Sequence, residues 1–253
     1  MSPLTYLYCI VRAERRPTVT RVPPGVPDAS AVQLVEVAPT LWLVTADVPR
    51  GTYGAGPLES SLSDLDWVAR VALAHEQVVE HFARRKSVVV IPMKLLTLFS
   101  GPERAAAEIL GRKRELMRVV RRIASAEEWG VRIVRGTPVT EIAAPTNPRS
   151  GAAFLTARKL ARDAARSSRL MAAEAAAEAY TRLARLCRDA VRRDAAPPGS
   201  TPPLLDAAFL VPSRTRARFT TAARREALAC AKAGAQLTLT GPWPPYNFVA
   251  SPQ

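Results

Sequence analysis

Residues 151–195 contain no proline and, after Gly151, no glycine, which constrains the fold more than any other stretch of the sequence. Alanine, arginine, leucine and glutamate dominate this run, and all four are strong helix formers. Small or apolar residues recur every three or four positions, as on one helix face: Phe154, Ala157, Ala161, Ala164, Ser168, Met171, Ala175, Ala179, Leu183, Leu186 and Ala190. An unbroken helix would measure roughly 65 Å. We expect it to break near residues 167–168 or 173–177 or to project at one end, and a helix of the same or another chain to cover its alanine stripe.

The first 135 residues alternate between strand-like and helix-like patterns. Residues 63–82 form a helix in which Ser63 or Asp64 caps the free amides, and its expected buried face is Leu65, Val68, Ala72, His75, Val79 and Phe82. Pro92 places strand 87–98 at an edge or a bulge. Residues 49–57 are rich in glycine and are expected to be a flexible surface connection. The remaining expected elements are strand 5–12, a hairpin of strands 32–37 and 41–46, a helix from residue 101 and strand 130–134.

A proline-rich break divides this pattern from the second half. Residues 136–150 hold three prolines and are predicted to be a linker. The fold prediction is α+β with two domains. Residues 1–135 form a ferredoxin-like domain with helices on one face of a mostly antiparallel sheet. Residues 151–253 form an α+β domain with the long Ala/Arg-rich helix, and its other expected elements are a loop at 197–203, strand 204–211, helix 215–233 and strand 236–240.

The charge is strongly basic, with 36 Lys plus Arg against 22 Asp plus Glu and a net charge of +14. Nucleic-acid binding is the usual inference from such a balance. However, arginine greatly outnumbers lysine, and alanine and proline are abundant, as a GC-rich genome would produce. The cations are spread over several helices, and no RNP-type aromatic motif, zinc finger or helix-turn-helix signature accompanies them. We favour a solvated basic surface facing an acidic protein partner, and a basic nucleic-acid-binding module on a ferredoxin-like scaffold remains the alternative.

No residue pattern predicts catalysis, a metal or a cofactor. His75 and His81 lie six residues apart and on different helix faces, and the three cysteines are too far apart for a zinc site. Asp64 and Asp66 are explained by the start of a helix. No apolar run approaches the ~20 residues of a membrane span, and no secretory signal opens the chain. We therefore expect a cytoplasmic protein that is not an enzyme and does not bind a membrane.

The closing string, residues 239–248, surrounds three aromatic side chains with three prolines. Proline fixes φ and removes a backbone donor, so the string is expected to form an ordered turn after a strand. Rigid aromatic residues are good anchors at protein interfaces. We therefore predict partner-binding roles for Trp243, Tyr246 and Phe248, and expect Trp243 to be the more buried and Tyr246 the more exposed of the first two.

Several motifs in order along the chain resemble the GvpF/GvpL family of gas vesicle proteins. Tyr6-Leu7-Tyr8-Cys9-Ile10-Val11 is similar to the family's opening strand, and His75-Glu76 falls where members carry a His-Glu pair on a helix. Ile91-Pro92-Met93-Lys94-Leu95-Leu96-Thr97-Leu98-Phe99 resembles the strand usually written Pro-Leu-Arg-Phe-Gly-Thr-x-Phe. Glu128-Trp129-Gly130-Val131-Arg132, Gly151-Ala152-Ala153-Phe154-Leu155 and the closing string match three further segments. The matches run from about Tyr6 to Val249.

This resemblance implies a non-enzymatic accessory protein of gas vesicle assembly, located in the cytoplasm at the gas vesicle. The implied partners are the shell subunit GvpA, bound during nucleation or growth of the shell, and other accessory Gvp proteins. Lys94 keeps a cation where the family usually has arginine, and we add it to the predicted partner-binding residues. Leu95-Leu96 replaces the usual Phe-Gly, so the close backbone approach that glycine allows is lost at Leu96.

Overall fold

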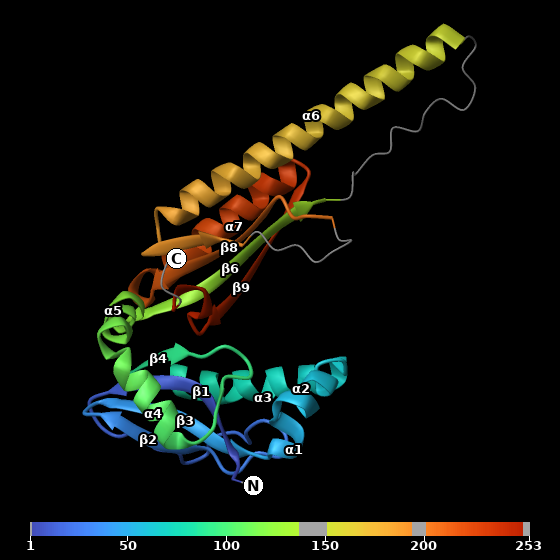
Figure 1. Cartoon of the computed structure of the whole chain (residues 1–253). Helices are drawn as coiled ribbons and strands as arrows, with labels where there is room; N and C mark the ends of the chain where they lie inside the picture. The colour runs from blue at the N-terminus through green and yellow to red at the C-terminus, as the bar shows by residue number, and fades with distance from the viewer. Residues whose placement is uncertain (1, 137–150, 194–200, 250–253) are drawn as a thin grey trace. The chain divides into compact units, whose positions relative to one another are not determined.

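The computed structural model describes residues 2–136, 151–193 and 201–249 (Figure 1). The chain forms two compact units, one made of Met1–Ala126 and Trp243–Gln253, the other of Glu127–Pro242. Each unit combines a β-sheet with helices, and the strand pairs are antiparallel. The predicted α+β class with antiparallel sheets is therefore confirmed. None of the helices in the described part of the chain is long and apolar enough to cross a membrane.

The first unit is built around the long strand β1, which is paired on both of its sides. The sheet order is β2-β3-β1-β4, and the short strand β5 also pairs with β1. The predicted opening strand and hairpin are present, and the bounds are β1 Leu4–Ala13, β2 Gln33–Ala38, β3 Leu41–Val48, β4 Val88–Pro92 and β5 Leu98–Phe99. Strand β1 is buried over nearly its whole length, because apolar side chains point to both faces of the sheet.

Helices cover both faces of this sheet, which differs from the expected arrangement on one face. Helix α3, Leu65–Ala83, packs with Tyr6, Tyr8 and Val11 on one face. Leu7 and Ile10 point to the other face and are equally buried. There, helices α4 (Pro102–Gly111) and α5 (Lys113–Ile123) contact the strands. A strand with apolar residues on both sides needs two covering layers, and the local pattern of β1 already carries that requirement.

The start of α3 is confirmed, whereas its predicted buried face is partly wrong. Asp64 accepts hydrogen bonds from the amides of Asp66 and Trp67, as expected of a cap. The buried residues are Trp67, Val71, His75, Val78, Val79 and Phe82. Leu65 was expected in the core but is 79% exposed. The face is therefore centred on the aromatic and β-branched side chains, which offer the larger apolar area.

Three segments near these elements also depart from expectation. The glycine-rich segment 49–57 is mostly helical, forming α1 (Arg50–Tyr53) and the first part of α2 (Ala55–Ser61). The buried ring of Tyr53 holds it in place, and its hydroxyl donates to the carbonyl of Pro27 at 2.8 Å. The helix expected from residue 101 is two helices, because the backbone of Arg112 leaves the helical region between α4 and α5.

The second unit contains the sheet β7-β8-β6-β9 with helices α6 and α7 (Figure 1). The bounds are β6 Ala126–Arg135, α6 Gly151–Ala184, β7 Asp189–Arg192, β8 Leu205–Pro212, α7 Arg216–Lys232 and β9 Ala235–Trp243. Its core joins Trp129, Val131 and Ile133 of β6 to the alanines of α6 and to Phe219 of α7. The helix expected over 151–195 ends at Ala184, because the chain turns there and enters β7, a strand that the sequence did not predict.

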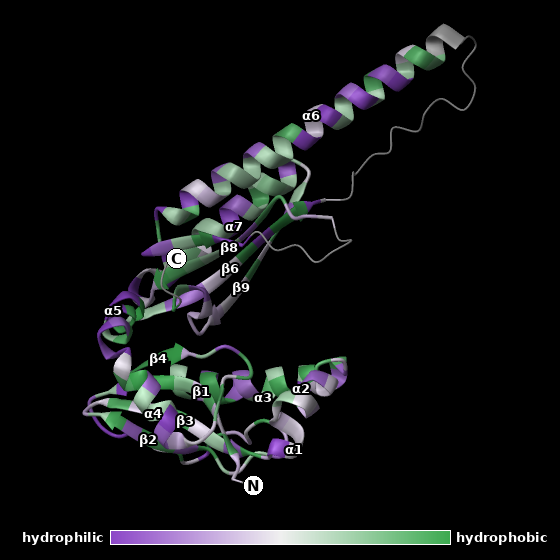
Figure 2. Cartoon of the chain, viewed as in Figure 1, coloured by the Kyte–Doolittle hydropathy of each residue, from purple (hydrophilic) through white to green (hydrophobic). Residues whose placement is uncertain are grey.

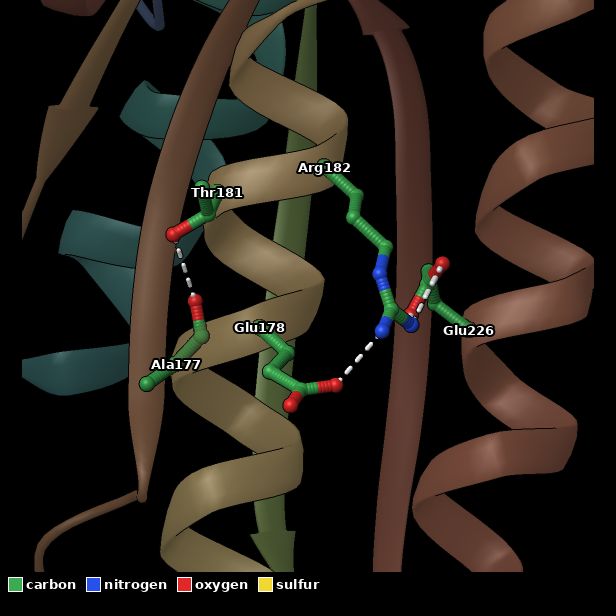
Figure 3. Close-up of polar contacts among 5 residues, drawn as sticks. All are labelled: Ala177, Glu178, Thr181, Arg182 and Glu226. Carbon is green, nitrogen blue, oxygen red and sulfur yellow. Dashed lines mark hydrogen bonds and ion pairs between the residues drawn. The ribbon is translucent and has the colours of Figure 1, made fainter.

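Helix α6 projects at its N-terminal end without breaking, one of the two outcomes expected for it. Ala172, Ala176, Ala179 and Leu183 are buried, so the C-terminal half is packed in the unit. Arg182 on this half bridges Glu178 on its own helix and Glu226 on α7 (Figure 3). Residues 154–171 are exposed apart from half-buried Ala157. The predicted stripe is partly wrong in this half: Ala179 and Leu183 are buried as expected, but Met171 is exposed, and Ala172 and Ala176 are buried instead. The expected cover by a helix of the same chain is present, because α6 packs on α7.

The two compact units do not follow the predicted domain limits of 1–135 and 151–253. Strand β6 belongs to the second unit, because it lies between β8 and β9 in that sheet. The tail from Trp243 belongs to the first unit, where Tyr246 and Phe248 are packed. Both exceptions are long-range pairings that local sequence does not report. The predicted linker 136–150 lies outside the described residues except for Gly136.

Candidate functional site

The closing tail is anchored in the core of the first unit by its last two aromatic residues. Phe248 is fully buried, and the ring of Tyr246 packs beside the core around α3. Trp243 is 43% exposed, so the expected order of burial for Trp243 and Tyr246 is wrong. Trp243 is still part of β9, which ends in two exposed residues. The one closing aromatic whose ring is well exposed is therefore Trp243.

Tyr246 is fixed to α3 by a short hydrogen bond. Its hydroxyl donates to Oε2 of Glu76 at 2.6 Å, and Oε1 of Glu76 is buried without a hydrogen-bond partner among the described residues. Burial raises the pKa of Glu76, and the bond from Tyr246 offsets only part of that effect. Burial and the neighbouring carboxylate also raise the pKa of the Tyr246 phenol. The hydrogen bond between Tyr246 and Glu76 therefore holds the tail in place, and the Glu76 carboxylate is partly buried.

His75, next to Glu76 in sequence, faces a different group of aromatics. Its Nδ1 lies 2.9 Å from the hydroxyl of Tyr6, and its ring is close to those of Tyr6, Tyr8 and Tyr246. Burial lowers the pKa of His75 to about 4, and the backbone of Met93 offsets this effect in part. The imidazole is thus neutral at pH 7. The two residues of the His-Glu pair hydrogen-bond to different tyrosines, His75 to Tyr6 and Glu76 to Tyr246, and form no dyad.

The segment between β4 and β5 passes beside this cluster and carries Lys94. The strand expected over 87–98 is interrupted here, and Lys94 and Leu95 are exposed in the interruption. Leu96 has φ 61°, a left-handed conformation that glycine adopts without strain and leucine does not. Its amide donates to the hydroxyl of Tyr6 at 3.2 Å. The position that glycine occupies in the resembling motif therefore has the conformation that favours glycine.

A row of exposed aliphatic side chains runs along the first half of α3 and the turn before it, and we call it the leucine stripe. It consists of Leu65, Ala69 and Leu73, which are spaced by four residues and so share one side of α3, together with Leu62 in the turn just before the helix. Leu65 and Leu73 are 79% and 62% exposed. A contiguous exposed apolar patch marks an interaction site more often than scattered leucines do. Sequence reasoning missed this surface because it placed Leu65 in the core. The four-residue spacing of Leu65, Ala69 and Leu73 was the available signal.

The described residues form no cluster of three or more metal-ligating side chains. The cysteines are free, and burial raises their pKa values, to about 11 for Cys187. Tyr6 and Tyr8, the aromatic residues of the central strand, are fully buried under α3 and cannot stack on bases. The arrangement offers exposed apolar and cationic side chains on a rigid frame, which are the means of binding another protein.

Comparison with known structures identifies the fold of the chain. The chain is similar over its whole length to two crystal structures of gas vesicle protein GvpF. The GvpF of Anabaena sp. PCC7120 aligns with a TM-score of 0.69 at 16% identity, covering 100% of this chain and 98% of that one. The GvpF of Microcystis aeruginosa aligns with a TM-score of 0.63 at 14% identity, covering 99% and 100%. At these identities the likeness establishes the fold.

Sequence comparison identifies the family. Residues 4–250 match the family described as "Gas vesicle synthesis protein GvpL/GvpF". "Gas vesicle protein L" of Streptomyces sp. (strain CB03234) is 30% identical over 222 residues, 82% of this chain and 79% of that protein. The chain belongs to the GvpL/GvpF family and has an accessory role in gas vesicles.

Proposed function

We propose that this protein is a non-enzymatic assembly factor that binds the gas vesicle shell subunit GvpA and other accessory Gvp proteins during nucleation or growth of the shell. The observation that carries the proposal is the leucine stripe, displayed on a chain that matches the family from residue 4 to residue 250. A strongly apolar shell subunit must be kept from premature association, and exposed aliphatic side chains on a stable frame shield such a subunit.

Two more exposed residues are proposed to bind partners. Trp243 presents a rigid aromatic ring, and Lys94 presents a cation on the segment beside the tail. Tyr246 and Phe248 contribute indirectly, because their burial fixes the tail that carries Trp243. This division of roles follows from exposure, since only a side chain that reaches solvent can enter an interface. The place of action is the gas vesicle and its growing shell.

Co-purification with GvpA of the same organism tests the proposal. Tagged chain and GvpA are co-expressed, and the amount of GvpA retained per mole of chain is measured for the wild type and for Leu65→Ser/Leu73→Ser. Leu110→Ser/Leu228→Ser is the matched control, because these leucines are 49% and 68% exposed but lie outside the leucine stripe. We expect the first variant alone to lose GvpA. Equal retention by all three proteins would remove the leucine stripe from the proposal, and no retention by the wild type would remove GvpA as a partner.

A further inference from the structure

The projecting half of α6 is longer than its neighbour in the unit can cover. Helix α6 has 34 residues and α7 has 17, so their lengths are about 51 Å and 26 Å. The two helices pack against each other, and the part of α6 that α7 covers begins near Ser168. The Oγ of Ser168 lies 3.6 Å from where a Cβ would stand at Gly234, just beyond the end of α7. Residues 154–167 therefore extend past α7 (Figure 1).

The face that packs on α7 continues along this extension. Ala172, Ala176 and Ala179 are buried against the unit. Counting back by three or four residues from Ala172 leads to Ser168, Ala165, Ala161, Ala157 and Phe154, which share that face. Phe154 is 46% exposed, and Met171 beside the face is 53% exposed. One half of an apolar helix face is thus packed, and the other half, ending in a phenylalanine, is open.

Cations gather along one edge of the open half. Arg158, Arg162, Arg166 and Arg169 follow one another at spacings of four, four and three residues, and Lys159 lies beside them. Asp163 is the one acidic residue between positions 154 and 171. No ion pair joins the five cations to an acid within the described residues. Like charges four residues apart repel, so opposite charge from outside would stabilise the helix. Figure 2 shows the polar and apolar residues interleaved along this part of α6.

The covered half of α6 shows how a helix can satisfy such a surface. On that half, α7 packs against the alanines. The carboxylate of Glu226 on α7 forms an ion pair with Arg182, with 3.1 Å between Oε2 and Nη1 (Figure 3). Small residues let two helices approach closely, and the carboxylate at the edge neutralises the arginine. The open half has a row of alanines and, in place of the single Arg182, a row of arginines, and no second helix of the described residues packs on it.

We propose that residues 154–171 of α6 dock an amphipathic helix of a partner protein, which lays its apolar face on Phe154 and the alanines and its acidic edge on the arginine row. A second copy of this chain is a poor occupant, because it would bring the same five cations. Nucleic acid would neutralise the arginines but leave the apolar half of the surface unused. The inference does not depend on GvpA being the partner of the leucine stripe.

Synthetic peptides of about 20 residues, long enough to be helical, serve as probes. The first contains Leu, Ala and Glu with the leucines three and four residues apart. The second has the same composition with the leucines scattered round the helix, and the third has Lys in place of Glu. A single-stranded DNA oligonucleotide is the fourth probe. Binding is read by fluorescence anisotropy at two salt concentrations, and helix content by circular dichroism.

Three variants locate the binding. Arg158→Glu/Arg162→Glu/Arg166→Glu reverses the arginine row, and Phe154→Ser removes the large apolar side chain. Arg114→Glu/Arg118→Glu/Arg121→Glu on α5 is the matched control, because it makes the same change in net charge at exposed positions of another helix. We expect the row reversal to weaken binding of the first peptide roughly tenfold or more, through lost attraction and new repulsion, and the control to change it less than about twofold.

The peptide comparison decides between the possible occupants. The proposal requires the first peptide to bind more tightly than the second and the third not to bind. Equal affinity for the first two peptides would show that charge alone acts, and binding of the oligonucleotide alone would assign the surface to nucleic acid. A dimer in sedimentation that is lost in the Phe154→Ser variant would assign it to a second copy. Each of these three results overturns the proposal.

Discussion

The hydroxyl of Tyr246 donates a hydrogen bond to Oε2 of Glu76 at 2.6 Å, although 170 positions separate the two residues in the chain. Through this bond the closing tail completes the first unit. The tail therefore contributes to the stability of that unit, and Trp243 lies three residues before the anchored Tyr246.

Tyr246→Phe should destabilise the protein. The change leaves a buried carboxylate without its donor, at a cost of about 1–3 kcal/mol. Glu76→Gln should cost less, because the amide still accepts from Tyr246 and carries no charge. Urea denaturation followed by tryptophan fluorescence measures both. Equal stability of Tyr246→Phe and the wild type would mean that the bond does not hold the tail.

Stability should fall with acid as His75 becomes charged. Its pKa is lowered to about 4 from an ordinary value of 6.5, so between these pH values the unfolded chain binds more protons than the folded one. Folding free energy is therefore lost as pH falls from 6.5 to 4, up to about 3 kcal/mol. Urea titrations across this range measure the loss, and His75→Asn should flatten it. An unchanged acid response in His75→Asn would contradict the assignment.

Glu76 should act in the opposite direction. Its pKa is raised in the folded state, so the folded chain binds more protons from the ordinary carboxyl pKa up to the raised value. Stability from this group falls as pH rises through that window. The free energy of unfolding of Glu76→Gln, relative to the wild type, should therefore increase with pH there. A difference that is constant with pH would contradict the burial of a charged Glu76.

Leu96→Gly should be more stable than Leu96→Ala. Both variants lose the leucine side chain, but only glycine adopts φ 61° without the penalty of about 1–2 kcal/mol that a Cβ brings. At Leu95, which has no positive φ, alanine should equal or exceed glycine. Melting temperatures of the four variants test this, and the usual alanine preference at both positions would refute it.

Trp243 and Phe248 should respond differently to truncation. Phe248→Ala removes a fully buried ring and should cost about 3–5 kcal/mol. Trp243→Ala removes an exposed ring and should keep the wild-type melting temperature while reducing partner affinity by about 2 kcal/mol. Thermal melts paired with the GvpA co-purification assay measure both. A strongly destabilised Trp243→Ala would show that this ring serves the fold.

Local chemistry made much of the fold predictable. The cap at Asp64, the hairpin of β2 and β3 and the long α6 follow from patterns within a few residues. The motif resemblance found the family, and it marked Leu96 as a position where glycine is usual. The structure explains why glycine is usual at this position, because the backbone of Leu96 is left-handed.

Long-range pairing escaped the sequence. Neither the place of β6 between β8 and β9 nor the return of Tyr246 to Glu76 leaves a trace in periodicity. The leucine stripe was hidden for another reason. Leu65 fits a three-and-four spacing with both Val68 and Leu73, and only packing decides which of the two helix sides is buried.

The most direct test is gas vesicle formation in cells that carry the gas vesicle gene cluster with only the gene for this chain deleted. The readout is the loss of light scattering when pressure collapses the vesicles. We predict that the wild-type chain and Leu110→Ser/Leu228→Ser restore the pressure-sensitive signal and that Leu65→Ser/Leu73→Ser does not. A full pressure-sensitive signal in cells without the chain would contradict its role as an assembly factor.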